Sequence, residues 1–110
     1  MKTCALLAVI VIFSAAPAAF AQAKGDAAEG KQAFMQHCAV CHGADGNGKP
    51  AIAQALKVTF PPLGGKEVQS LSDTEIAKVV AEGKGKMQPV HGVTKKDVAN
   101  IIAFIRTLKK

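Results

Sequence analysis

The chain has 110 residues and a formal charge of +6, from 14 lysines and arginines against 8 aspartates and glutamates. It contains no tryptophan or tyrosine, and its basic residues are not interleaved with aromatic ones, which argues against nucleic-acid binding. This length fits one small domain, and the positive charge predicts docking to acidic partners.

The first 21 residues have the pattern of a secretory signal peptide. Lys2 precedes an apolar run that ends at Pro17, and Ala19-Phe20-Ala21 forms a small-x-small cleavage site. We therefore predict cleavage after Ala21, with cleavage after Ala23 as the alternative.

Cleavage would leave residues 22–110 as one exported domain in the periplasm, with no membrane insertion. An uncleaved anchor is the competing interpretation, because the apolar stretch is nearly long enough to span a bilayer. The exported domain would keep only two cysteines, Cys38 and Cys41. A disulfide between them would close a very short loop and add little stability, so another use of both thiols is expected.

A first helix is expected from about Ala27 to Cys38 or Cys41. Asp26 is a favourable N-cap, and Glu29 follows it three residues later. Gly30 inside this helix costs about 1 kcal/mol relative to alanine, which indicates that another segment packs closely against it.

The end of this helix carries the sequence Cys38-Ala39-Val40-Cys41-His42. C-x-x-C-H is the attachment motif of c-type haem, because two thiols one helical turn apart can each add to a vinyl group. The histidine that follows projects onto the iron as the proximal ligand. We therefore predict one covalently bound haem c.

The same residues have two alternative uses. His37 completes a Cys2His2 set that zinc would accept by ligand type, but structural zinc sites normally draw their ligands from two separated segments. A thioredoxin-like pair of cysteines would need a βαβ pattern, which the sequence lacks. Haem attachment therefore remains the favoured interpretation.

The middle of the chain is rich in turn residues. Residues 43–49 predict a glycine-rich turn that Pro50 ends, and a backbone carbonyl near Pro50 is a candidate acceptor for the second ring nitrogen of His42. We expect a short helix over residues 51–58 and then loops over Pro61 to Gly65.

Capping boxes mark the starts of two later helices. Ser72 with Glu75 begins one that ends near Gly83, and Thr94 with Asp97 begins the last. The last helix places five aliphatic residues on one face, namely Val98, Ile101, Ile102, Ile105 and Leu108. No stretch alternates like a strand, so we predict an all-α fold with three main helices.

A six-coordinate electron-transfer haem needs a second axial ligand, which is usually a methionine thioether. Met87 lies on the glycine-rich loop between the two capped helices and is the favoured ligand. Met35 lies on the proximal helix, from which it cannot reach the opposite face of the ring, so core packing is its expected role. His91 is the competitor of Met87, and a bis-histidine haem would have a lower potential.

These residues resemble the class I, single-haem bacterial c-type cytochromes over nearly all of residues 22–110. The resemblance rests on Gly30-Lys31, Phe34, residues 38–46, the Gly-Lys-Gly-Lys-Met87 loop and Ala103-Phe104-Ile105-Arg106. It implies a small fold wrapped around one haem, in which the first and last helices cross at Gly30 and Phe104 packs there. The family often has proline directly after the ligand methionine, whereas here Gln88 intervenes before Pro89.

The resulting hypothesis is a monomeric periplasmic electron carrier with His42 and Met87 as axial ligands, and not an enzyme. Lys49, Lys84 and Lys86 would frame the haem edge and steer redox partner proteins that present acidic surfaces. Two alternatives stay open. One is a haem c subunit of a larger oxidoreductase complex, and the other is a ligand-binding or peroxidase-like haem protein with an open sixth site.

Overall fold

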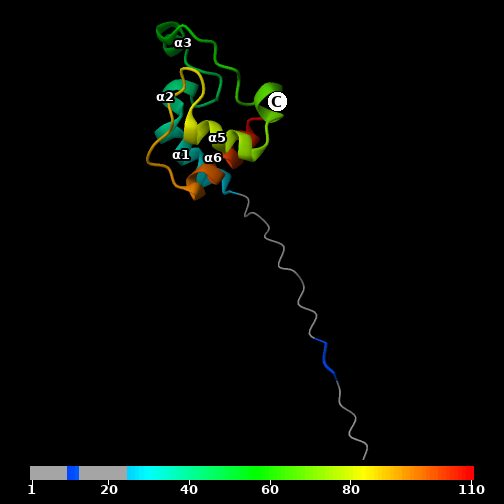
Figure 1. The fold of residues 1–110 in the computed structure, drawn as a ribbon. Coiled ribbons are helices and arrows are strands. Elements are labelled where there is room, and N and C mark those ends of the chain that lie inside the picture. The colour runs from blue at the N-terminus through cyan, green and yellow to red at the C-terminus, as the bar shows by residue number, and fades with distance from the viewer. Residues whose placement is uncertain (1–9, 13–24) are drawn as a thin grey trace, which may run out of the picture.

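The computed structural model describes residues 10–12 and 25–110, so the predicted cleavage site lies outside the described residues. Its helices in chain order are α1 (Ala27–His37), α2 (Ala39–His42), α3 (Pro50–Leu56), α4 (Lys66–Gln69), α5 (Asp73–Glu82) and α6 (Lys95–Thr107). Figure 1 shows α1, α5 and α6 gathered in one body, with α3 set apart at its edge.

The prediction of an all-α fold is confirmed. Within residues 25–110 the β-type pairing is limited to one isolated bridge between Lys84 and Met87. No helix in the described part of the chain is both long enough and apolar enough to cross a membrane.

Helix α1 begins where the sequence predicts. The Asp26 carboxylate accepts hydrogen bonds from the backbone N–H groups of Ala28 and Glu29, at 2.8 and 3.1 Å. The helix ends one residue before the motif, and Cys38 then serves as the N-cap of the single turn α2. The predicted helix is therefore present, but it is divided at Cys38.

Helices α1 and α6 pack against each other at Gly30, where side-chain volume is excluded. A Cβ atom at Gly30 would overlap the backbone carbonyl of Asn100 and lie 3.0 Å from the amide nitrogen of Ile101. The first and last helices therefore cross at Gly30, as the resemblance implies. One turn after Gly30, the fully buried Phe34 packs on Phe104 of α6, with ring centroids 5.1 Å apart at 56°.

Asn100 is the buried polar residue of this interface, with 4% of its surface exposed. Its side-chain oxygen accepts from the Asp26 N–H at 2.8 Å, and its amide nitrogen donates to the Glu29 carboxylate at 3.0 Å. Glu29 therefore does not complete a local capping box at the start of α1. Asn100 satisfies the cap residue's N–H from across the interface, which couples the start of α1 to α6.

Both predicted capping boxes are present. Ser72 accepts from the Glu75 N–H at 3.1 Å, and the Glu75 carboxylate accepts from the Ser72 N–H at 2.6 Å. The Thr94 hydroxyl likewise accepts from the Asp97 N–H at 3.1 Å, and the Asp97 carboxylate accepts from the Thr94 N–H at 2.8 Å. The apolar face of α6 enters the core as predicted, and the buried hydrophobic residues are Phe34, Ala39, Leu63, Val68, Ile76, Val80, Ile101, Ile102, Phe104 and Ile105.

Helix α3 occupies almost the predicted range, with Pro50 at its first position and Lys57 ending it in a left-handed conformation at φ 54°. Proline suits the first position because its missing N–H would have no partner there. Helix α4 lies within the linker before α5 and was not predicted. Four residues are too few to give a periodic signal.

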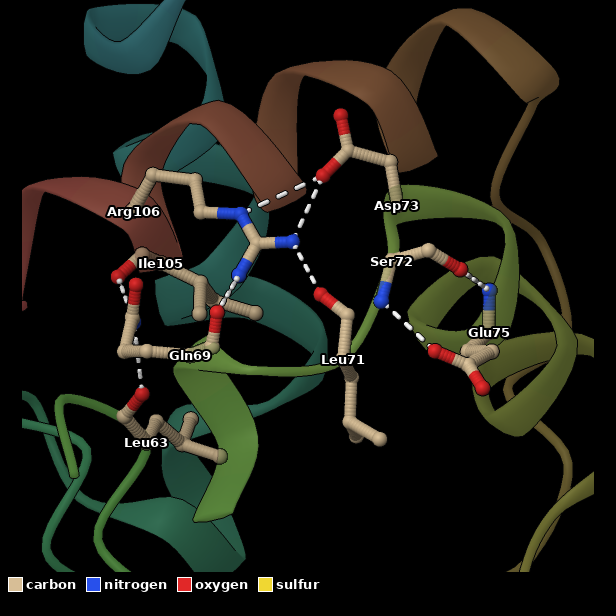
Figure 2. Close-up of polar contacts among 8 residues, drawn as sticks. All are labelled: Leu63, Gln69, Leu71, Ser72, Asp73, Glu75, Ile105 and Arg106. Carbon is tan, nitrogen blue, oxygen red and sulfur yellow. Dashed lines mark hydrogen bonds and ion pairs between the residues drawn. The ribbon is translucent and has the colours of Figure 1, made fainter. Parts of the chain in front are cut away.

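Arg106 of α6 fixes this unpredicted segment, as Figure 2 shows. Its guanidinium donates to the carbonyls of Gln69 and Leu71 at 3.0 and 2.6 Å, and it pairs with Asp73 at 2.8 Å. The Gln69 side chain in turn donates to the carbonyls of Leu63 and Ile105. The linker between α4 and α5 is therefore held by contacts with the last helix.

Candidate functional site

The residues of the C-x-x-C-H motif share one helical turn. The N–H groups of Cys41 and His42 both donate to the Cys38 carbonyl, at 3.2 and 2.9 Å. Both cysteines are free and half-buried. Burial raises the pKa of the Cys38 thiol from 9.0 to about 11, so it is protonated at neutral pH. Catalytic redox cysteines have lowered pKa values, and this thiol has the opposite environment.

His42 is half-buried at the end of this turn, and burial lowers its pKa below the usual 6.5. Its imidazole is therefore neutral at neutral pH, which is the form that ligates a metal. The ring of Phe60 packs edge-on against it, with centroids 5.3 Å apart at 63°. Phe60 was not among the predicted site residues, because the pattern around it marks only a loop.

One ring nitrogen of His42 is left without a partner. Its Nδ1 is buried and makes no hydrogen bond. Buried polar atoms are nearly always paired, so this atom marks a histidine whose environment is incomplete in the protein alone. The acceptor expected near Pro50 is not observed among the described residues. The loop before Pro50 is hydrogen-bonded to the backbone of the motif. The Gly48 N–H donates to the His42 carbonyl at 2.7 Å, and the Lys49 N–H donates to that of Cys41 at 2.9 Å.

The glycine-rich turn after the motif fixes Phe60 in place. Gly48 has a φ of +85°, and a Cβ atom there would lie 2.5 Å from the Cβ of Phe60. The turn is closed by Asp45, whose carboxylate accepts from the backbone and side chain of Asn47, each at 3.0 Å. These hydrogen bonds lower the pKa of Asp45 below 3.8, so the turn keeps an ionised carboxylate at neutral pH.

Met87 lies on a separate tight turn after α5. Its backbone pairs with Lys84 through two hydrogen bonds of 2.9 and 3.0 Å, and Gly85 between them adopts a φ of +58°. Met87 is half-buried, and His91 is exposed. Met35 is 45% exposed, so its expected role in the core is wrong.

The three basic residues of the site loops have different environments. Lys49, Lys84 and Lys86 are all exposed. Lys86 alone among them makes a side-chain contact in the described residues, donating to the Leu56 carbonyl at the end of α3 at 2.5 Å. The motif residues thus share one turn, while Met87 lies on a loop that is hydrogen-bonded to the end of α3.

The Cys2His2 alternative involves His37 together with the motif residues. In residues 10–12 and 25–110, no three side chains of histidine, cysteine, aspartate or glutamate gather as a group that could hold a metal ion. His37 belongs to the last turn of α1, whereas His42 ends α2.

Comparisons with known proteins identify the family. A family model described as cytochrome c oxidase, cbb3-type, subunit III, matches residues 25–105. Cytochrome c6 of Picosynechococcus sp. is 33% identical over 106 residues, which are 92% of this chain and 86% of that protein. The chain belongs to the class I c-type cytochromes.

A solved structure agrees with the assignment of this chain to the c-type cytochromes. The KustC0563 c-type cytochrome superposes with a TM-score of 0.62 at 30% identity, over 74% of this chain and 98% of that one. A thiosulfate dehydrogenase of Stutzerimonas stutzeri is 50% identical over 42 residues, which are 38% of this chain. This cytochrome spans only 13% of the length of that dehydrogenase.

As a member of this family, the cytochrome is an electron carrier with covalently bound haem c. The described residues fit that group. Two free cysteines lie on one turn, and the neutral imidazole beside them has an unpaired buried nitrogen. Thioether attachment and axial ligation are the chemistry that this set of donors can provide.

Proposed function

We propose that this cytochrome carries electrons in the periplasm through one haem c, attached at Cys38 and Cys41 and ligated axially by His42 and Met87. The observation that carries the proposal is the grouping of two free thiols and a neutral imidazole on the single turn α2. When bound, the haem supplies a one-electron ferric–ferrous couple.

The protein's part in this function is to hold and orient the ligands. The N-terminal end of α2 presents one thiol and its third residue the other, and the backbone bonds from Gly48 and Lys49 hold this turn against the loop that follows. Phe60 packs on the His42 ring and limits its rotation. A neutral His42 can bind iron without first losing a proton, which the lowered pKa supports.

Met87 is the sixth ligand in this proposal. Its turn is closed by two backbone hydrogen bonds with Lys84, and the chain is hydrogen-bonded to α5 on either side of the turn, at Gly83 and Val90. A methionine thioether raises the haem potential relative to a second histidine. His91 is the rival, but it is exposed and lies beyond this closed turn.

The ligand assignment is tested by Met87→Ala, with His91→Ala as the matched control. Met87→Ala should keep covalent haem, lose the weak near-infrared band of methionine–ferric iron ligation, and bind carbon monoxide in the ferrous state. His91→Ala should keep the band. If the unmutated protein lacks the band, and His91→Ala but not Met87→Ala opens the ferrous haem to carbon monoxide, the sixth ligand is His91. Tight binding of carbon monoxide by the unmutated protein would indicate an open sixth site.

Export and partner docking complete the proposal. Residues 1–21 would be removed as a signal peptide, which mass determination of the exported protein tests directly. The exposed Lys49 and Lys84 would steer acidic redox partners, without catalysis by the cytochrome itself. Added salt should then slow electron transfer to such partners, because it screens exposed charges.

A second candidate is a haem subunit of an oxidoreductase complex. The family model named for an oxidase subunit and the local identity with a thiosulfate dehydrogenase both favour it. Gel filtration of a native extract separates the two functions. A free carrier elutes as a monomer, whereas a subunit elutes with a larger assembly.

A further inference from the structure

Lys86 joins the loop of the proposed sixth ligand to helix α3. Its Nζ donates to the carbonyl of Leu56 at 2.5 Å. Leu56 is the last residue of α3, and the next two N–H groups bond to carbonyls earlier in the helix. The Leu56 carbonyl is thus one of the helix-end acceptors that lack a helical partner, and a cation is favourable at this end of a helix.

The Lys86 contact acts on Met87 through a short, closed turn. The two residues are adjacent, and both lie within the turn closed by the Lys84–Met87 backbone pair. A Cβ atom at Gly83 would overlap the Met87 carbonyl, so the base of the turn is also closely packed. Fixing the Lys86 side chain therefore restrains the position of the Met87 backbone.

Helix α3 is connected at both ends to the turn that carries His42. Before it, the Lys49 N–H bonds to the Cys41 carbonyl at 2.9 Å. After it, the chain leads to Phe60, whose ring packs on His42. Lys86 therefore links the loop of the proposed sixth ligand to the segment that packs around the proposed fifth ligand.

We propose that Lys86 is a positioning residue that keeps the Met87 loop closed against α3 and so disfavours replacement of Met87 by external ligands. This inference rests on the proposed assignment of Met87 as the sixth ligand. An external ligand must wait for the loop to open, and its apparent affinity is reduced by the small fraction of molecules that are open. Removing the Lys86 bond increases that fraction without touching the ligand atoms.

The test is an imidazole titration of the ferric holoprotein, in which loss of the near-infrared methionine band reports binding of imidazole. Imidazole is suitable because its neutral form does not respond directly to a change in surface charge. Lys86→Gln should bind imidazole about five-fold more tightly, equivalent to about 1 kcal/mol of loop opening. Lys84→Gln changes the net charge equally on the same turn and should match the unmutated protein.

Lys86→Arg provides the rescue, because a guanidinium can also donate to the Leu56 carbonyl. Its imidazole affinity should return towards that of the unmutated protein. The proposal is overturned if Lys86→Gln and Lys84→Gln bind imidazole equally, or if Lys86→Arg behaves like Lys86→Gln.

The near-infrared band of the unmutated protein separates the two possible failures. If the band is present and the variants do not differ, only the role of Lys86 is wrong. If the band is absent, the Met87 assignment fails, and the role of Lys86 fails with it.

Discussion

Replacing Gly30 by alanine should destabilise the cytochrome although alanine is the better helix former. At an ordinary exposed helix position, glycine to alanine gains about 1 kcal/mol. At Gly30 the new methyl group would overlap the Asn100 carbonyl, a backbone group that cannot rotate away. Overpacking of this kind costs about 1–3 kcal/mol, and a backbone obstacle places it at the upper end. We expect a net loss of about 2 kcal/mol.

The matched control measures helix propensity alone on the same helix. Gln32 is exposed in the interior of α1, so Gln32→Gly should be less stable than Gln32→Ala by about 1 kcal/mol. Urea unfolding of the oxidised holoproteins, followed by far-ultraviolet circular dichroism, gives each free energy of unfolding. For a domain of this size, Gly30→Ala should lower the melting temperature by roughly 10 °C. A Gly30→Ala protein as stable as the parent would refute the close approach of α1 and α6.

Three further predictions concern Arg106, Thr94 and the haem-attachment residues. Arg106→Gln should lower the free energy of unfolding, measured in urea, by about 2 kcal/mol because two backbone carbonyls lose a charged donor. The exposed ion pair contributes little, so Asp73→Asn should lower it by less than 1 kcal/mol. Equal losses in the two variants would contradict a larger role for the carbonyl contacts than for the ion pair. Thr94→Ala should lower the free energy of unfolding by about 1 kcal/mol through loss of the N-cap of α6, and an unchanged denaturation midpoint would show that the cap does not contribute. Cys38→Ala or Cys41→Ala should leave at most one thioether bond and greatly reduce the yield of holoprotein, and His42→Ala should prevent maturation. Haem staining of the denatured protein measures these yields. Normal staining of either cysteine variant would contradict attachment at two points.

The parts of the fold that sequence alone predicts are those fixed by near neighbours. Ser72 and Thr94 each pair with a residue three positions ahead, so the starts of α5 and α6 follow from the local pattern. The Cys38–His42 motif is contiguous and needs only one turn of helix. Gly30 is also recognisable locally, because a glycine in a helix interior costs stability that a close approach of another segment can offset.

Contacts between distant residues account for what the sequence did not predict. Asn100 caps the start of α1 across 74 positions, which explains why Glu29 does not form the local box that its spacing suggests. The end of helix α4 is held by Arg106, which donates to the Gln69 carbonyl from 37 positions further along the chain. The α6 backbone lies against Gly30, 70 positions away in the sequence. The contacts of Phe60 with His42 and of Lys86 with Leu56 depend on the path of the chain through α3. None of these pairings has a periodic or local pattern.

The visible and near-infrared absorption spectrum of the exported, unmutated protein, oxidised and then reduced, is the most direct test of haem attachment and axial ligation. Attachment at Cys38 and Cys41 with His42 and Met87 as ligands should give sharp c-type bands on reduction and the weak near-infrared band of methionine ligation in the ferric state. Haem bands without the near-infrared feature would contradict ligation by Met87. The absence of any haem after competent maturation would contradict attachment at Cys38 and Cys41.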